Sequence, residues 1–323
     1  EREIQHADWL AEAFQKDGLQ NSWDARIDKK KGIGWTAKIQ LITNSRDEAL
    51  FLILEDKGTK GLTGQIPRSK EESVIILQKE DPNERLSYFL NSDWSKKGEG
   101  AIGSRGRGKM VLVGSSIDSK MYYESLRSSD NKYIFGKVFL DENKEIQVSI
   151  DEGEEALRLR NETFNKIPKI DDFGTRIIIP NPKKEIVDAI RERRILNIIQ
   201  ETWWEILQKY SAEIKIGIDN NLEKIEKSDW LPVKNSGVKI QEEYPNIEVE
   251  PGFKIKRINI GYLEDKEIPF SYQGVSIQRG GMRVEKKSLS QYSSELALLP
   301  IYGSVEFEPN LEEEMQKYES PEH

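Results

Sequence analysis

The segment AEAFQKDGLQNSWDA, residues 11–25, combines a helical pattern with an unusual placement of polar residues. Leu10, Ala13 and Phe14 recur at the three-and-four spacing of a helix face that packs on a core. The same stripe then continues in three polar residues, Asp17, Asn21 and Asp24. Because an unpaired buried carboxylate is costly, the second half of this helix either turns into water or lines a polar cleft. Taken alone, the segment favours the solvated face.

The composition limits the kinds of site that the chain can build. The chain has 323 residues, which suggests two domains, and the 33% charged and 36% hydrophobic residues indicate a soluble cytoplasmic protein. We expect no membrane segment, because no apolar run reaches the length of a span. The chain has no cysteine and only two histidines, His6 and His323, which excludes disulfides, zinc–cysteine sites and histidine triads. Any metal is therefore a hard cation with oxygen ligands, usually Mg²⁺ beside phosphates.

A second signal is a buried strand that ends in acids and glycines. Residues 49–54 form a continuous apolar run of strand length, and EDKGTKGLTG (residues 55–64) follows at once. The glycines allow backbone to approach a ligand, and Asp56 offers a fixed acceptor for a donor such as an exocyclic amine. A glycine-rich hairpin turn explains this motif equally well.

A third signal is GSRGRGK, residues 103–109, which opens a predicted helix. Free backbone N–H groups at glycines, together with Arg105, Arg107 and Lys109, suit a phosphate cradle. The motif is not a Walker A loop, since the spacing and the ending differ. It is not a dinucleotide fingerprint either, because no strand immediately precedes it.

The remaining pattern predicts an α+β fold. Three strand-like segments with short turns between residues 121 and 150 indicate an antiparallel meander, and a further strand enters through Gly174-Thr175. An interrupted helical region spans residues 183–210 and a closing strand follows. Helices on one face of an antiparallel or mixed sheet make an α/β sandwich. Beyond Asp219 loops and strands dominate, which predicts a first domain over residues 1–220 and a smaller α/β domain over residues 221–323. From the start at Glu1 and the charged C-terminal end we expect a piece of a larger protein, truncated at the C-terminus.

The glycine-bearing motifs and the opening helix occur in one order: Asp17-x-x-x-Asn21, Asp56-x-Gly58, Gly103-x-x-Gly106-x-Gly108 and Gly174-Thr175. Together they resemble the four ATP-site motifs of the GHKL ATPases, which include gyrase, the ninety-kilodalton heat-shock chaperones, histidine kinases and MutL-type mismatch-repair proteins. The resemblance covers about residues 5–220, and the approach through Ser95-Lys96-Lys97 looks most like the Microrchidia branch and its bacterial relatives. It implies a Bergerat-type α/β sandwich, with ATP between the helices and the open face of the sheet, followed by a transducer-like domain.

The resemblance also implies roles for single residues. Asn21 would coordinate Mg²⁺, and Asp17 would orient the water that attacks the γ-phosphate. Asp56 would accept a hydrogen bond from the adenine amine, Thr175 would support it through water, and Gly58 would let the backbone pass close to the base. The other residues expected at the nucleotide are Asp24, Gly103, Gly106, Gly108 and Lys109.

Three departures from the family pattern affect the expected activity. One is that the lid motif runs straight from Gly108 into Lys109, where many relatives place an apolar residue. The base position carries Asp17 instead of the usual Glu, and Gly18 behind it weakens the helix by about 1 kcal/mol. The loop motif is one residue longer than usual, so Gly61 has no assigned counterpart. We therefore expect Mg²⁺-dependent ATP binding, with slow hydrolysis that drives lid closure and an ATP-dependent homodimer. A non-hydrolysing nucleotide sensor is the alternative.

Other functions are weaker interpretations of the same sequence. A histidine kinase needs a phosphoacceptor histidine on a dimerisation helix, and neither His6 nor His323 lies in one. A DNA-engaging clamp gains no support from the net charge of −8, which leaves room only for a local basic patch. Arg279 and Arg283 are candidates for a basic residue that reaches the γ-phosphate from the second domain, or they are ordinary hairpin charges.

Overall fold

The computed structural model describes residues 8–67, 81, 83–90, 108–227, 240–250, 253–262, 272–289 and 301–307, and the single positions 72, 75, 76, 78, 293 and 294. These residues form two compact units. Unit 1 contains the described residues up to Asn197 and from Tyr210 to Ile225, and unit 2 contains Ile198–Lys209 and the described residues after Ile225. The assignment of separate functional domains to residues 1–220 and 221–323 stays a prediction. No helix among the described residues is long and apolar enough to cross a membrane.

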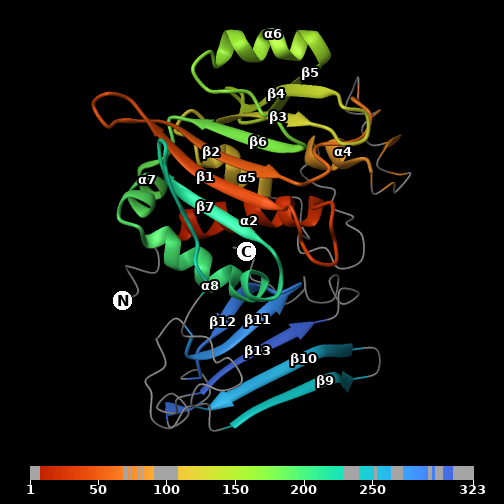
Figure 1. Ribbon diagram of the computed structural model, residues 1–323, viewed down its shortest axis with the longest axis vertical. Helices are drawn as coiled ribbons and strands as arrows, with labels where there is room; N and C mark the ends of the chain where they lie inside the picture. Colours follow the sequence, from red (N-terminus) through yellow and green to blue (C-terminus); the bar gives the residue numbers. More distant parts are fainter. Residues whose placement is uncertain are drawn as a thin grey trace. The chain divides into compact units, whose positions relative to one another are not determined.

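Unit 1 is built on a mixed sheet of eight strands in the order β5-β4-β3-β6-β2-β1-β7-β8 (Figure 1). Neighbouring strands are antiparallel, except that β1 and β7 run parallel. The central strands bury apolar side chains such as Ile39 of β1, Leu52 of β2 and Ile179 of β6, and these residues form the core of the unit. The strand bounds are β1 Thr36–Thr43, β2 Ala49–Lys57, β3 Lys120–Leu126, β4 Tyr133–Leu140, β5 Ile146–Glu152, β6 Gly174–Pro180, β7 Glu213–Ile218 and β8 Asn221–Lys224.

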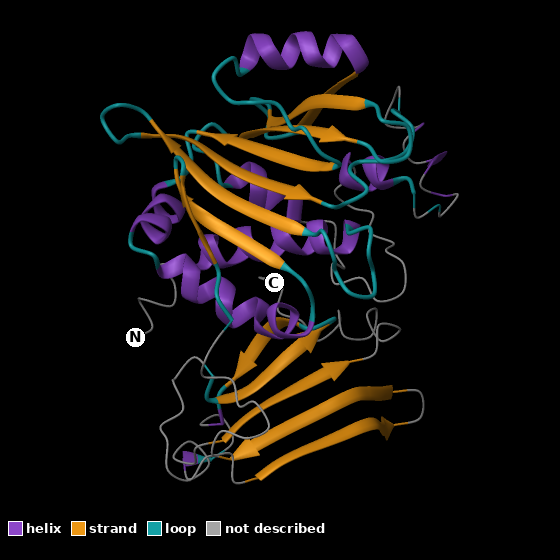
Figure 2. Cartoon of the chain, in the orientation of Figure 1, coloured by secondary structure: helices purple, strands orange, loops and turns teal. Residues whose placement is uncertain are grey.

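One face of this sheet is covered by helices that include α2 (Trp9–Ala25), α5 (Gly108–Gly114) and α7 (Lys184–Arg191) (Figure 2). Helix α2 contacts both α5 and α7. Gly18 lies where α2 crosses β2, and a Cβ at this position would overlap the side chain of Leu54. The glycine therefore costs helix propensity but allows the helix to approach the sheet closely. The sequence pattern reveals the cost but not this reason for it.

The opposite face of the sheet carries α6 (Gly153–Thr163), which the sequence did not predict. Ala156 and Phe164 pack there against Ile53 of β2 and Ile178 of β6. Both figures show α6 on the side of the sheet away from α2. The predicted fold class, an α+β sandwich followed by a smaller α/β unit, is confirmed, with α6 as an addition on the second face.

The two remaining helices are α4 (Arg85–Leu90) and α8 (Arg194–Lys209), and α8 belongs to unit 2 from Ile198 onward. Unit 2 contains a five-stranded sheet in the order β12-β11-β13-β10-β9. Its strands are β9 Ile240–Glu250, β10 Phe253–Tyr262, β11 Gly274–Arg279, β12 Met282–Lys287 and β13 Ile301–Phe307. Within the unit, Arg283 pairs with Glu201 of α8 (3.0 Å between Nη2 and Oε2), which gives this arginine a structural partner. The charged helix predicted at residues 310–318 lies outside the described residues.

Candidate functional site

The site begins at Asp56, where β2 leaves the core. Its side chain lies on the α2 face of the sheet and is only 8% exposed. Its Oδ1 accepts hydrogen bonds from the Thr59 hydroxyl (2.5 Å) and from the Thr175 backbone N–H (2.9 Å). The Ser22 hydroxyl of α2 also donates to this carboxylate. Ser125 of β3 completes the group, since its Oγ lies 3.3 Å from the Thr175 hydroxyl oxygen. We call Asp56, Ser22, Thr59, Ser125 and Thr175 the Asp56 cluster.

The carboxylate of Asp56 is buried without a cation to pair with it among the described residues. Burial raises its pKa to about 6, against the opposing effect of the hydrogen bonds from Thr59, Thr175 and Ser22. Three groups thus donate hydrogen bonds to one carboxylate, but these bonds do not fully compensate for the hydration that the carboxylate loses on burial. A buried acid in this state can accept a further hydrogen bond from a ligand donor at a net gain.

Ser22 is held in place by an aromatic residue that directly precedes β1. Trp35 is buried, and its indole N–H donates to Ser22 Oγ (2.9 Å). The Trp35 ring meets the Trp23 ring of α2 edge-on, with 5.0 Å between centroids. The contacts from Trp35 through Ser22 to Asp56 therefore join the segment before β1 to α2 and β2.

The loop after β2 is closed against several elements. Gly58 has a φ of +69°, and a Cβ there would overlap the carbonyl of Gly34. The Gly58 N–H donates to Phe173 O (3.1 Å), and the Leu62 N–H donates to Ser125 Oγ (2.9 Å). Strand β2 pairs with β1 and β6, and the next strand after the loop among the described residues, β3, does not pair with it. The hairpin-turn alternative for residues 55–64 is therefore wrong.

Strand β6 begins with Gly174, whose lack of a side chain lets the strand lie close to Asp56. A Cβ at Gly174 would overlap the main-chain carbonyl of Asp56. The absence of a side chain lets β6 approach Asp56 closely enough for the Thr175 N–H to reach the carboxylate. The Ser125 hydroxyl donates to Gly174 O (2.6 Å), which ties β3 to the same point.

The acidic and amide residues of α2 lie along the same helix. Asn21 is exposed, and its Nδ2 donates to the Asp17 carbonyl one turn earlier (2.9 Å). Because Asn21 precedes Ser22, it lies one residue from a hydroxyl that contacts Asp56. The end of α2 is fixed to the glycine loop, since the Ile27 N–H donates to Gly58 O (3.0 Å). The fold thus brings the motif of α2 and the motif of β2 together.

Asp24 lies in a different environment from Asn21. It is 5% exposed, and its main-chain carbonyl accepts hydrogen bonds from Lys29 Nζ and from Arg85 Nη2 (3.2 Å). The pKa of Lys29 is lowered to about 8, mainly by burial and then by the charges of Arg26 and Arg85. Asp24 therefore belongs to a charged cluster at the C-terminal end of α2.

The glycine-rich lid motif is described only in part. Gly103 and Gly106 lie outside the described residues, and Gly108 is the first residue of α5. Lys109 is buried, and its amine donates to the Leu90 carbonyl at the end of α4. Helix α5 contacts α2, so this end of the motif lies beside the helix that carries Asp17 and Asn21.

Three hydroxyl residues of the site were not identified from the sequence, namely Ser22, Thr59 and Ser125. Thr59 stands inside the glycine loop and Ser22 directly follows Asn21, so proximity to the motifs was a usable signal for both. Ser125 carried no such signal, because it reaches the site only through the pairing of β3 with β6. Among the described residues, no group of three acidic or histidine side chains is placed to hold a metal ion.

Comparisons with known proteins give a limited result. No protein-family model and no curated protein matches the chain. Among solved structures, it is similar to the ATPase and transducer domains of DNA topoisomerase II from Balamuthia mandrillaris, with 11% identity and a TM-score of 0.47 over 93% of this chain and 72% of that one. It is also similar to the ATPase region of Saccharomyces cerevisiae topoisomerase II bound to ICRF-187 (dexrazoxane), with 11% identity and a TM-score of 0.48 over 93% and 73% of the two chains. At this identity and with TM-scores below 0.5, neither likeness assigns an activity to this chain.

Proposed function

We propose that unit 1 binds ATP with Mg²⁺ in the manner of the GHKL ATPases and hydrolyses it slowly. The observation that carries the proposal is the buried Asp56 carboxylate, which has hydroxyl and N–H partners but no ion-pair partner among the described residues. The ordered motifs of the sequence supply the second support, since Asp17, Asn21 and Asp56 fall on elements that meet.

The residues of the site suit the chemistry of adenine and magnesium. Asp56 is an acceptor, and an exocyclic amine is a donor that this acid can bind without a proton of its own. Gly58 and Gly174 keep side chains away from the backbone at this point. Asn21 would supply one oxygen ligand to Mg²⁺, and phosphate and water oxygens would complete its coordination, as is usual for this ion. ATP would contribute the phosphoryl group whose transfer Asp17 assists.

Asp17 would act as the base that orients the attacking water, and Lys109 would add positive charge near the phosphates. In this proposal closure of the segment around Gly103 and Gly106 over the nucleotide favours a homodimer, through a ligand-linked shift between two states. The Microrchidia-like branch remains the nearest expectation within the family.

Calorimetry with a non-hydrolysable ATP analogue and Mg²⁺ tests the binding site. Asp56→Asn presents an amide donor where adenine also donates, so the affinity should fall by on the order of 1–3 kcal/mol or more, which is a loss of about fivefold to more than a hundredfold. Asp171→Asn is the matched control, because this exposed acid pairs with Lys57 on the opposite side of the strand. Parental affinity in Asp56→Asn would show that the adenine site lies elsewhere.

A second measurement separates hydrolysis from sensing. Asp17→Asn should keep analogue binding and lower single-turnover hydrolysis about a hundredfold or more, the usual scale for losing a general base. Asp17→Glu should hydrolyse at least as fast as the parent if the shorter acid is only a handicap. An unchanged rate in Asp17→Asn would favour the nucleotide-sensor alternative.

A further inference from the structure

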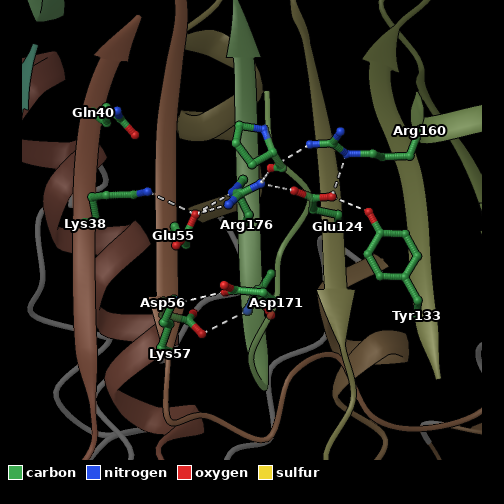
Figure 3. A network of polar contacts seen from close by, with 12 residues as sticks. Lys38, Gln40, Glu55, Asp56, Lys57, Glu124, Tyr133, Arg160, Asp171 and Arg176 are labelled. Atoms are coloured by element: carbon green, nitrogen blue, oxygen red, sulfur yellow. Dashed lines mark hydrogen bonds and ion pairs between the residues drawn. The ribbon is translucent and has the colours of Figure 1, made fainter. Parts of the chain in front are cut away.

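A row of charged side chains crosses the sheet on the face opposite to the Asp56 cluster. Lys38 of β1, Glu55 of β2, Arg176 of β6 and Glu124 of β3 are cross-strand neighbours, and we call them the ionic row (Figure 3). Lys38 Nζ lies 3.2 Å from Glu55 Oε2, and Arg176 forms ion pairs with both Glu55 and Glu124. Each acid of the row is therefore paired on at least one side with a cation.

The row is anchored beyond the sheet by α6. Arg160 of α6 donates through Nε to Glu124 Oε2 (3.0 Å), and it also donates to the main-chain carbonyls of Phe164 (2.9 Å) and Pro168 (2.8 Å). Arg176 donates to the same Pro168 carbonyl. The Tyr133 hydroxyl of β4 donates to Glu124. A single carboxylate thus connects β3, β4, β6 and α6.

Stability alone does not explain why charged residues, and not apolar ones, occupy the ionic row. Glu124 is fully buried, and Glu55 and Arg176 are 5% and 6% exposed. Charges removed from water in this way lose solvation that their mutual attraction repays only partly, and apolar residues of similar size often serve as well. The same face of β2 and β6 is in fact apolar at Ile53 and Ile178, one cross-strand pair away. The change from apolar to charged residues occurs at the level of Asp56.

Three members of the row are covalent neighbours of the Asp56 cluster. Glu55 precedes Asp56, Arg176 follows Thr175, and Glu124 precedes Ser125. Successive residues of a strand point to opposite faces, so each pair shares one peptide unit between the row and the cluster. A change in the spacing of β2, β6 and β3 at the row is therefore transmitted directly to the donors around the Asp56 carboxylate.

We propose that the ionic row is a positioning device for the Asp56 cluster. By fixing β3 and β6 against β2, it holds the Thr175 N–H and the Ser125 hydroxyl at the distances that shape the acceptor site. Its members touch no ligand, and Glu124 and Arg176 act through Ser125 and Thr175. The expected effect on nucleotide affinity rests on the proposed function. The arrangement of donors around Asp56 does not depend on bound nucleotide.

The test compares Glu124→Gln with Ile178→Ala. The first variant keeps the size of the side chain but removes the charge that binds Arg160 and Arg176. The second is a matched control, because it destabilises the same face of the sheet without removing a member of the row. Both are studied at a temperature at which each is fully folded, and Ile178→Val replaces the control if its thermal midpoint lies closer to that of Glu124→Gln.

The first readout needs no nucleotide. The indole N–H resonance of Trp35, assigned by its loss in Trp35→Phe, reports on the Ser22–Asp56 contact because this N–H donates to Ser22. We expect Glu124→Gln to shift this resonance and Ile178→Ala to leave it in place. The second readout is the affinity for the ATP analogue, which should fall about tenfold in Glu124→Gln and less than twofold in the control, the scale typical of groups behind a binding site.

Equal effects of the two variants on the resonance would overturn the positioning role and leave the row a structural contact. If the parental chain binds no analogue, the proposed function fails, and the Trp35 resonance still decides the role of the row. If Glu124→Gln does not fold, Lys38→Met removes the half-buried outer end of the row instead. A Trp35 resonance that does not move in that variant would likewise count against the proposal.

Discussion

The two faces of the same three strands use their polar residues in opposite ways. On the α6 face, Glu55 and Glu124 meet arginines, and every acid of the ionic row has a cation partner. On the α2 face, Asp56 has only hydroxyl and N–H donors among the described residues. The acids of the ionic row are neutralised by cations of the protein itself, whereas a buried acid without a cation can still accept a hydrogen bond from a ligand. Two successive residues, Glu55 and Asp56, therefore belong to a structural ion-pair network and to a candidate binding site, respectively.

The largest effect should come from breaking the paired face. Arg176→Met removes the central cation and leaves Glu55 and Glu124 buried with fewer partners. Loss of one member of a buried ion pair typically costs 3–5 kcal/mol, so we expect the free energy of unfolding to fall by about that amount. Urea denaturation measures it. Arg158→Met, on the exposed surface of α6, serves as the control and should leave stability near the parental value. A change in Arg176→Met no larger than in this control would remove the distinction between the faces.

The contribution of Asp56, on the α2 face, to the free energy of unfolding should depend on pH. Its sign is opposite to that of an acid in an ion pair, which stabilises the fold less as the pH falls. Because burial raises the folded-state pKa of Asp56 to about 6, above its usual 3.8, the folded state binds a proton that the unfolded state releases between these values. The contribution of Asp56 to stability therefore increases as the pH falls through 6 and is absent above it. The full difference is about 3 kcal/mol, at 1.36 kcal/mol per pKa unit.

Denaturation of the parent and of Asp56→Asn at pH 5 and pH 7.5 isolates this contribution. The variant cannot ionise at this position, so it should lose the part of the pH dependence that comes from Asp56. The stability of the variant relative to the parent should therefore be higher at pH 7.5 than at pH 5. The same pH profile in both proteins would mean that Asp56 is not desolvated in solution.

The smallest effect should come from the solvent-exposed end of the paired face. Lys57 and Asp171 form an ion pair (2.7 Å), but their side chains are 35% and 76% exposed. Surface pairs of this kind contribute about 0–1 kcal/mol because water and salt screen them. Lys57→Met should therefore change the unfolding free energy by less than about 1 kcal/mol in the same denaturation series. A loss as large as that in Arg176→Met would show that burial does not explain the strength of the ionic row.

Much of the α2 face could be predicted from the sequence. The three-and-four pattern of residues 11–25 predicted the helix α2, and the apolar run at residues 49–54 predicted β2. The predicted core stripe of α2 was wrong in part, because the buried face runs through Ala11, Phe14 and Leu19 and not through Leu10 and Ala13. Asp56 was selected because a buried strand ends in an acid beside glycines, and the structure places it at that end. These signals are local, so a single segment of chain contains each of them.

The opposite face could not be predicted in the same way. Glu55, Glu124 and Arg176 are separated by up to about 120 residues, and only the pairing of β2, β3 and β6 brings them together. Helix α6 escaped prediction because it buries little besides Ala156 and Arg160, so its apolar stripe is too weak to recognise. Gly18 was interpreted as a weakness of α2, since its contact with Leu54 depends on how the helix crosses the sheet.

The alternation of Glu55 and Asp56 has a consequence for insertions and deletions. If β2 lost one residue before position 55, the two acids would exchange faces, because a shift by one residue reverses every side chain of a strand. Asp56 would then enter the layer of arginines, and Glu55 would be left among hydroxyls. A length change in the turn at residues 44–48, which the Asn44 and Glu48 side chains close at the surface, has no such effect on β2. Tolerance to changes in chain length should therefore differ sharply between these two neighbouring segments.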